Sequence, residues 1–263
     1  MRFVAMIVGY LAALGGSRAA EPPREWVVDG VARRAVVFSP TAGDGPAPLV
    51  FAFHGHGGTA AHAARTYAFH THWPEAVVVY PQGLNTPGQL TDPEGKKSGW
   101  QATAGDQQDR DLKFFDAMLK SLTGEATADP KRVYSTGHSN GGAFTYLLWA
   151  ERGGALAAVA PSSAVPPRSG VKNLKPKPAL HLAGKADPLV VWAWQERAID
   201  AVRELNGCDA GGKPWAKAGD LVGTEYASGT GTPLVTLVHP GGHTLPPEAP
   251  KLMVKFMQAH PAK

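Results

Sequence analysis

Short, almost continuous apolar runs recur along this chain, and they constrain its fold more than any other feature. Each run spans four or five residues, too few for a helix that could bury itself. Runs of this length and apolarity are typical of parallel strands that are buried on both faces of a sheet. The six runs are Leu49–Phe53, Ala76–Tyr80, Val133–Thr136, Ala157–Ala160, Ala179–Ala183 and Leu234–Val238.

Helical periodicity fills several intervals between these runs. Residues 112–122 place their apolar side chains on one helical face, and Asp109 or Asp111 is in position to cap the first turn. Three more helices are predicted in the same way, over Gly142–Arg152, over Val191–Leu205 and from Pro250 onward.

The first strands differ from the others. Trp26–Phe38 alternates around Asp29-Gly30, which predicts an antiparallel hairpin. Strands alternating with helices after such a start indicate an α/β fold, a mostly parallel sheet with helices on both faces. No linker rich in Gly, Ser or Pro divides the chain, so we expect residues 20–263 to form a single catalytic domain.

The first residues are expected to be a targeting segment rather than part of the fold. Met1-Arg2 is positively charged, and the apolar run Phe3–Leu14 is shorter than the roughly 20 residues that span a bilayer. Small side chains follow, so residues 1–19 are predicted to be a signal peptide, with cleavage after Ala19 (Ala20 is the alternative). The mature protein would then be secreted to the periplasm or the medium. No later segment is long and apolar enough to span a membrane.

Charge and cysteine content exclude several classes of partner. Lys and Arg number 26 against 22 Asp and Glu, and no basic cluster indicates nucleic-acid binding. Cys208 is the only cysteine, so no intrachain disulfide can form. It lies in a predicted turn with no base nearby in the sequence, and we interpret it as structural or incidental.

A Gly-x-Ser-x-Gly pattern follows the third apolar run. Gly137-His138-Ser139-Asn140-Gly141 leaves a predicted strand and opens a predicted helix, the context in which this pattern forms a nucleophile elbow. A sharp turn there strains Ser139 and exposes its hydroxyl, while Gly137 and Gly141 must be small because the chain passes close to itself. The alternative is a glycine-rich turn with an incidental serine. We predict Ser139 as a catalytic nucleophile and interpret His138 as a packing residue.

A second glycine-rich segment follows the first apolar run. His54-Gly55-His56-Gly57-Gly58 occupies the position from which the early loop of an α/β-hydrolase donates one oxyanion N–H, and the residue after the nucleophile donates the other. The predicted oxyanion hole is therefore formed by the backbone amides of His56 and Asn140.

Two further strand ends carry an acid and a base. Asp187 follows the run Ala179–Ala183, and His243 follows Leu234–Val238 after two glycines. The order Ser139, Asp187, His243 is that of α/β-hydrolases, in which the histidine takes the proton of the serine and the acid orients the histidine. Other candidates are less suitable: Asp200 is in mid-helix, Asp209 is in a turn, His181 is in mid-strand, His239 is still at the strand end and His260 is near the C-terminus.

Paired histidines raise the alternative of a metal site. His54 and His56 are two residues apart, as are His70 and His72, but no third ligand with suitable spacing accompanies either pair. We predict no metal and no cofactor.

Together these motifs resemble the α/β-hydrolase esterase family that includes extracellular polyhydroxybutyrate depolymerases and feruloyl or acetylxylan esterases. The resemblance covers about residues 26–258. It departs from many relatives at His56, where they have cysteine, and at Leu245-Pro246, where they have Trp-Pro, and a disulfide that some relatives form near the active site is impossible here. The motifs that carry the resemblance are residues 48–58, Tyr80-Pro81-Gln82-Gly83, Gly137–Gly142, Gly184-Lys185-Ala186-Asp187 and Gly242-His243-Thr244.

The resemblance implies a secreted serine esterase that hydrolyses carboxylic esters through an acyl-enzyme. Its expected substrates are feruloyl or acetyl esters of plant polysaccharide, or a polyester of the polyhydroxybutyrate type. A peptidase or amidase on the same fold, and a non-catalytic polymer-binding protein, are the alternatives. The expected partner is therefore an ester, small or polymeric, and the sequence leads to no prediction of oligomeric state.

A long loop between Gly83 and Gln108 has neither helical nor strand periodicity, and such loops are usually functional. It leaves the edge of the sheet where ligands bind in open α/β folds. Trp100 is its only aromatic residue and either stacks on the substrate or fixes the loop to the body of the protein. We predict Trp100 and Trp192 as substrate-binding residues.

Overall fold

The computed structural model describes residues 23–125, 127–167 and 171–262. The predicted signal peptide and its cleavage site lie outside the described residues. The strands are β1 (Arg24–Val28), β2 (Val31–Phe38), β3 (Ala47–Phe53), β4 (Val77–Pro81), β5 (Leu84–Asn85), β6 (Ser98–Gly99), β7 (Ala128–His138), β8 (Ala158–Ser162), β9 (Ala179–Gly184), β10 (Lys213–Ala218), β11 (Leu221–Tyr226) and β12 (Leu234–His239). The α-helices are α1 (Ala60–Tyr67), α2 (Phe69–His72), α3 (Arg110–Gly124), α4 (Asn140–Arg152), α5 (Trp192–Leu205) and α6 (Ala249–Gln258).

Ten of the described strands form one sheet, in the order β1-β2-β4-β3-β7-β8-β9-β12-β11-β10. The six strands from β4 to β12 in this order are parallel, and they are the six apolar runs of the sequence. Antiparallel strands extend both edges, since β1 and β2 pair as the predicted hairpin, and β11 and β10 follow β12. The predicted α/β architecture and its N-terminal hairpin are confirmed.

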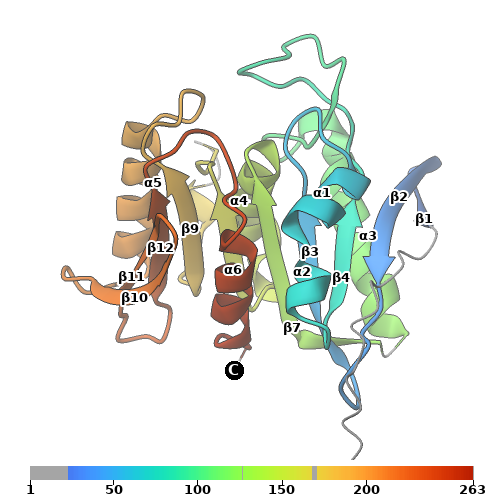
Figure 1. Cartoon of the computed structure of the whole chain (residues 1–263). Coiled ribbons are helices and arrows are strands. Elements are labelled where there is room, and N and C mark those ends of the chain that lie inside the picture. Colours follow the sequence, from blue (N-terminus) through green and yellow to red (C-terminus); the bar gives the residue numbers. More distant parts are fainter. Residues whose placement is uncertain (1–22, 126, 168–170, 263) are drawn as a thin grey trace, which may run out of the picture.

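Helices cover both faces of the sheet (Figure 1). Along β3, successive side chains alternate between two apolar cores: Phe51 and Phe53 pack with α3 and α4, whereas Val50 and Ala52 pack with α1, α2 and α6. All of these strand side chains are completely buried. Burial on both faces explains why the runs are continuous rather than alternating.

The start of α3 corrects part of one prediction: Asp109 occupies the N-cap position, but neither its side chain nor that of Asp111 makes a capping hydrogen bond. The Asp109 carboxylate accepts hydrogen bonds from the side chain of Gln101 and from the backbone of Gly105. The Asp111 carboxylate is buried against the guanidinium of Arg33 at 2.7 Å. A buried carboxylate needs a cation or several hydrogen-bond donors. Arg33, which is distant in the sequence, fills this need for Asp111 in place of the backbone N–H groups at the start of the helix.

Candidate active site

Ser139 lies in the turn between β7 and α4 with φ 57° and ψ −122°, a backbone conformation that residues other than glycine rarely adopt. The flanking glycines allow this turn. A Cβ atom on Gly141 would lie 2.3 Å from the carbonyl oxygen of Phe53, and one on Gly137 would lie 2.5 Å from the backbone of Gly141. The turn therefore has the geometry of the predicted nucleophile elbow, and its strain is held by tight packing around it.

Two backbone amides lie beside this turn. Asn140 is the first residue of α4, where a helix leaves its N–H groups without internal partners, and neither its amide nor that of His56 has an acceptor among the residues that the structure describes. Both residues line one cavity with Ser139. Their side chains are engaged elsewhere: the Asn140 carboxamide holds the backbone of Trp100, and His56 Nε2 bonds Asp92 at 3.0 Å. The two amides are thus available to an oxyanion, as the prediction requires.

His243 and Asp187 form a hydrogen-bonded pair, with 2.8 Å between His243 Nδ1 and Asp187 Oδ2. Asp187 is 4% exposed, and its other oxygen accepts hydrogen bonds from the backbone N–H groups of Leu189 and Val190 at 2.9 Å each. Asp187 thus uses both carboxylate oxygens, one toward the backbone and one toward His243. A carboxylate that accepts from Nδ1–H of the imidazole leaves Nε2 as a base.

The elbow and the acid–base pair meet through His138. The centroids of the His138 and His243 rings are 4.8 Å apart, and His138 precedes Ser139 in the chain. No hydrogen bond joins Ser139 directly to His243 within the described part of the chain, which is common before substrate binds. The rejected acid candidates lie elsewhere: Asp200 is paired with Arg203 on the surface, and Asp209 is exposed in a turn.

His138 makes contacts on both sides of its ring. Its Nδ1 lies 3.0 Å from the Ser162 hydroxyl, and the ring is also hydrogen-bonded to the backbone of His243. Burial, followed by the nearby charge of His243, lowers the pKa of His138 to about 4. His138 is therefore neutral near pH 7 and joins β8, the elbow and the segment that carries the base.

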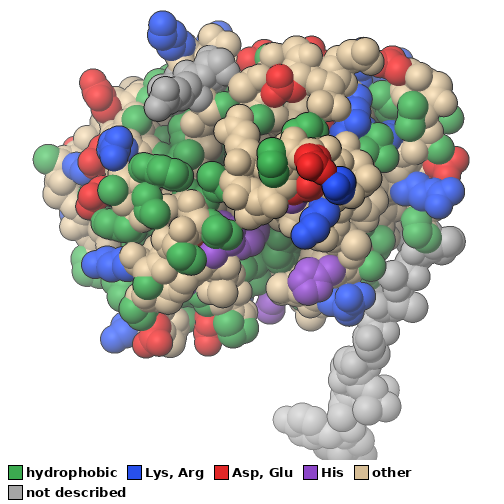
Figure 2. All heavy atoms as spheres, turned by 90° about the horizontal axis from the view of Figure 1, so that it is seen from above, with side chains coloured by type: hydrophobic (Ala, Val, Ile, Leu, Met, Phe, Trp, Pro, Cys, Tyr) green, Lys and Arg blue, Asp and Glu red, His purple; other side chains and the backbone are tan. Residues whose placement is uncertain are grey.

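The Ser139 cavity has a volume of about 860 Å³, within the range of about 300–1,000 Å³ that small-molecule sites usually have. Its walls are mainly apolar, and three of the lining residues, Leu90, Leu189 and Trp194, are large hydrophobic residues that remain exposed. Figure 2 looks onto this end of the molecule, where hydrophobic side chains gather around histidines near the middle of the face. Exposed hydrophobic side chains that converge on one cavity mark a binding site.

The two tryptophans predicted to bind substrate do not line this cavity. Trp100 is completely buried, its indole N–H donates to the carbonyl of His54 at 2.8 Å, and its ring packs between Phe53 and Phe144. These contacts favour the interpretation that Trp100 fixes the loop to the body of the protein. Trp192 lies in a different cavity. Trp194, two residues further along α5, lines the Ser139 cavity instead, and no pattern in the sequence distinguishes these two helix positions.

The histidine pairs have structural partners. His54 Nε2 accepts from the backbone N–H of Gly83 at 3.0 Å, and His70 Nδ1 lies 3.0 Å from the Tyr80 hydroxyl. Across the described residues, no group of three or more His, Cys, Asp or Glu side chains could hold a metal ion. Likewise, no helix in the described ranges is long and apolar enough to cross a membrane.

Solved structures similar to this one include several esterases. The acetyl xylan esterase from Aspergillus awamori aligns with a TM-score of 0.66 and 13% identity over 90% of this chain and 99% of its own. A Bacillus cereus carboxylesterase aligns with a TM-score of 0.61 and 18% identity, over 86% and 94% of the two chains. At such identities the likeness shows the fold. The chain has the α/β-hydrolase fold.

Sequence relatives of this chain carry esterase names, although no protein-family model matches it. It is 33% identical to a protein described as esterase NocK from Nocardia uniformis subsp. tsuyamanensis, over 54% of this chain and 40% of that protein. It is 27% identical to feruloyl esterase C of Emericella nidulans, over 57% and 55% of the two chains. It is 26% identical to the bifunctional acetylxylan esterase/xylanase XynS20E of Neocallimastix patriciarum, over 68% and 25%.

The aligned region thus spans only 25% to 55% of the length of these three relatives. Their names agree with the predicted resemblance to feruloyl and acetylxylan esterases, and together with the fold they support a carboxylic ester hydrolase. They do not show a polyhydroxybutyrate depolymerase.

Proposed function

We propose that this α/β-hydrolase is a secreted serine carboxylic ester hydrolase, with residues 20–263 as its single catalytic domain. The observation that carries the proposal is the buried, hydrogen-bonded pair of His243 and Asp187 beside the strained elbow of Ser139. A carboxylate, an imidazole and a strained serine in this arrangement are the components of nucleophilic acyl transfer.

In the proposed reaction, Ser139 Oγ attacks the ester carbonyl while His243 Nε2 takes its proton. The carbonyl oxygen becomes an oxyanion, to which the amides of His56 and Asn140 donate. Collapse of this intermediate breaks the C–O bond, and the protonated His243 gives its proton to the leaving alcohol. Water, activated by His243, then attacks the acyl-enzyme and releases the carboxylic acid and free Ser139.

The shape of the cavity favours an ester with a bulky apolar acyl group. Leu90, Leu189 and Trp194 offer more apolar surface than an acetyl group could cover, and an aromatic acyl group such as feruloyl would cover it. Among the substrates considered, feruloyl esters of plant polysaccharide therefore rank first, with acetyl esters and polyhydroxybutyrate-type polyester behind them.

The test compares hydrolysis of methyl ferulate, acetylated xylan, polyhydroxybutyrate and a p-nitroanilide by the same preparation. We expect ester turnover, fastest on methyl ferulate, that disappears in Ser139→Ala. Turnover of the anilide at the rate of the esters would indicate an amidase, and no turnover of any substrate would refute the enzymatic assignment. A covalent acyl adduct on Ser139, seen by mass spectrometry after quenching, would identify the nucleophile.

A further inference from the structure

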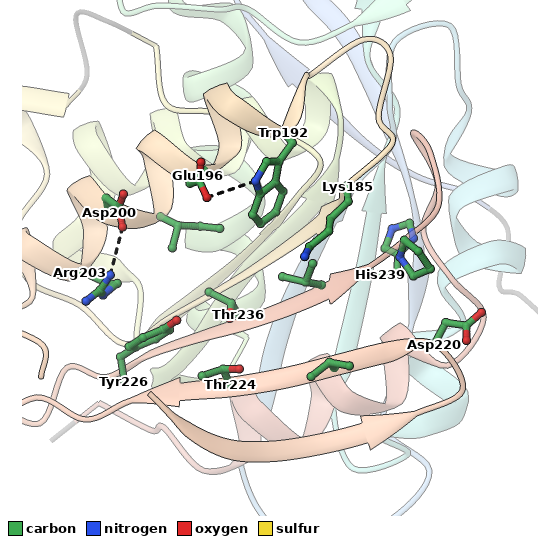
Figure 3. A pocket seen from close by; sticks show the side chains of 14 residues that line it. Lys185, Trp192, Glu196, Asp200, Arg203, Asp220, Thr224, Tyr226, Thr236 and His239 are labelled. Atoms are coloured by element: carbon green, nitrogen blue, oxygen red, sulfur yellow. Dashed lines mark hydrogen bonds and ion pairs between the residues drawn. The ribbon is translucent and has the colours of Figure 1, made fainter. Parts of the chain in front are cut away.

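A second cavity lies between α5 and the strands β11 and β12 (Figure 3). Its volume of about 530 Å³ is within the range of small-ligand sites. One end is formed by the segments of Lys185 and His239, which are joined by a 2.9 Å backbone hydrogen bond. Its lining residues are distinct from those of the Ser139 cavity and include Trp192, Glu196, Asp200, Arg203, Thr224 and Thr236.

Each wall of the cavity carries polar side chains beside apolar ones such as Ile199 and Val238, whereas a helix packed on a sheet normally presents an apolar face. Trp192, Glu196 and Arg203 fall on one face of α5, because they are spaced by four and seven residues. On the sheet opposite, Thr224 and Thr236 are direct cross-strand neighbours and line the same cavity. Polar residues thus face each other across a groove that is otherwise lined by apolar side chains, whereas the contacts of α3 and α4 with the sheet are apolar.

Two buried polar atoms in this lining have no hydrogen-bond partner among the described residues, His239 Nε2 and Arg203 Nε. His239 is only 5% exposed, and its ring is hydrogen-bonded to the backbone of Thr244, which leaves Nε2 as the unused nitrogen. Buried polar atoms are normally paired, so these two unpaired nitrogens are an unusual feature of the lining.

An aromatic face completes the lining. The Trp192 indole N–H donates to Glu196 at 3.2 Å, and the Lys185 ammonium lies 5.7 Å from the centre of the ring. The side chains of Trp192 and Lys185 extend into the space above the strands (Figure 3). At the other end, the Arg203 guanidinium is 4.6 Å from the Tyr226 ring and bonds Asp200.

We propose that this groove binds a neutral saccharide. The C–H face of a sugar ring would stack on Trp192, while its hydroxyls would exchange hydrogen bonds with Glu196, Thr236 and His239. Lining cations and carboxylates nearly balance, with Lys185 and Arg203 against Glu196, Asp200 and Asp220, so the groove has no excess charge that would select a phosphate or a polyanion. Binding here requires no catalysis, so the inference stands apart from the proposed function.

The test uses the full chain carrying Ser139→Ala, so that no turnover interferes, and titrates it with xylotetraose and with cellotetraose by calorimetry. We expect saturable binding at millimolar concentrations by at least one of them. Trp192→Ala should weaken that binding about threefold to tenfold, because it removes the stacking face. Glu196→Gln, which keeps the size of the side chain and cannot disturb the core, should weaken it about twofold or more.

Trp194→Ala is the matched control, since Trp194 lies on the same helix but lines the Ser139 cavity. Its saccharide affinity should equal that of the parent. The proposal is overturned by absence of binding, by loss of binding in Trp194→Ala, or by parental affinity in Glu196→Gln. Parallel loss in Trp192→Ala and Glu196→Gln with retention in Trp194→Ala supports it.

Discussion

The ring of His138 lies 4.8 Å from that of His243, at an angle of 47° between their planes. His138 also bonds the Ser162 hydroxyl and the backbone of His243. His138, which directly precedes the proposed nucleophile Ser139, thus connects the elbow with the loop that carries the proposed base His243. These contacts hold the elbow and the His243 loop, two segments that are distant in the sequence, next to each other.

Replacing His138 by Phe should lower kcat about tenfold and leave KM nearly unchanged, because the ring volume stays while both hydrogen bonds are lost and His243 is held less firmly. His138→Gln, which can restore one of the bonds, should recover part of the rate. Steady-state kinetics on p-nitrophenyl acetate measure both effects. A change confined to thermal stability, with kcat intact in both variants, would show that His138 only packs.

The choice of Asp187 as the acid has a direct test. Asp187→Asn should lower kcat by up to about 10⁴-fold, because the amide no longer favours the Nδ1-protonated imidazole. Asp209→Asn serves as the control, since Asp209 lies in an exposed turn near the end of α5. Equal activity of the two variants would mean that another residue is the acid.

Buried His181 predicts a dependence of stability on pH. Burial lowers its pKa from 6.5 to about 4 in the folded state, where its ring bonds the Tyr146 hydroxyl. Between those two values the unfolded chain binds the proton and the folded chain does not, so the free energy of unfolding falls as pH decreases from about 6.5 to about 4.

The contribution of His181 to this fall is about 3 kcal/mol. Urea unfolding at several pH values should show a shallower fall for His181→Leu than for the parent. An identical slope in both proteins would assign the effect to other groups, of which His138 is the first candidate because burial lowers its pKa in the same direction.

The central strands and the pairing of Asp187 with His243 were predictable because their signals are local. Short apolar runs mark the parallel strands, and residues that directly follow such strands meet at one edge of the sheet. The edge hairpin of β10 and β11 was not predicted, because Lys213–Ala218 contains a proline and two lysines and is only partly buried. The buried pair of Arg33 and Asp111 was also missed, since nothing in the sequence links residues 78 positions apart.

Export can be tested without knowledge of the substrate. If residues 1–19 are a signal peptide, the mature protein begins at Ala20, or at Glu21 if cleavage follows Ala20. N-terminal mass spectrometry of protein recovered from periplasm and medium gives the answer. Soluble cytoplasmic protein that retains Met1 would contradict secretion.

Trp194 and Trp100 give the most specific prediction for the Ser139 cavity. Trp194 is 43% exposed and lines that cavity, whereas Trp100 is completely buried. Trp194→Ala should lower kcat/KM for methyl ferulate about threefold to tenfold more than for p-nitrophenyl acetate, because only the larger acyl group reaches the indole.

Trp100→Ala should act differently. Removing a buried indole leaves a cavity beneath the oxyanion segment and costs about 3–5 kcal/mol of stability, so the melting temperature should fall by many degrees. Its residual activity should fall equally on both esters, since the ring contacts neither. If selectivity between the two esters changed in Trp100→Ala and not in Trp194→Ala, the acyl group would lie against the segment that Trp100 supports and not against Trp194.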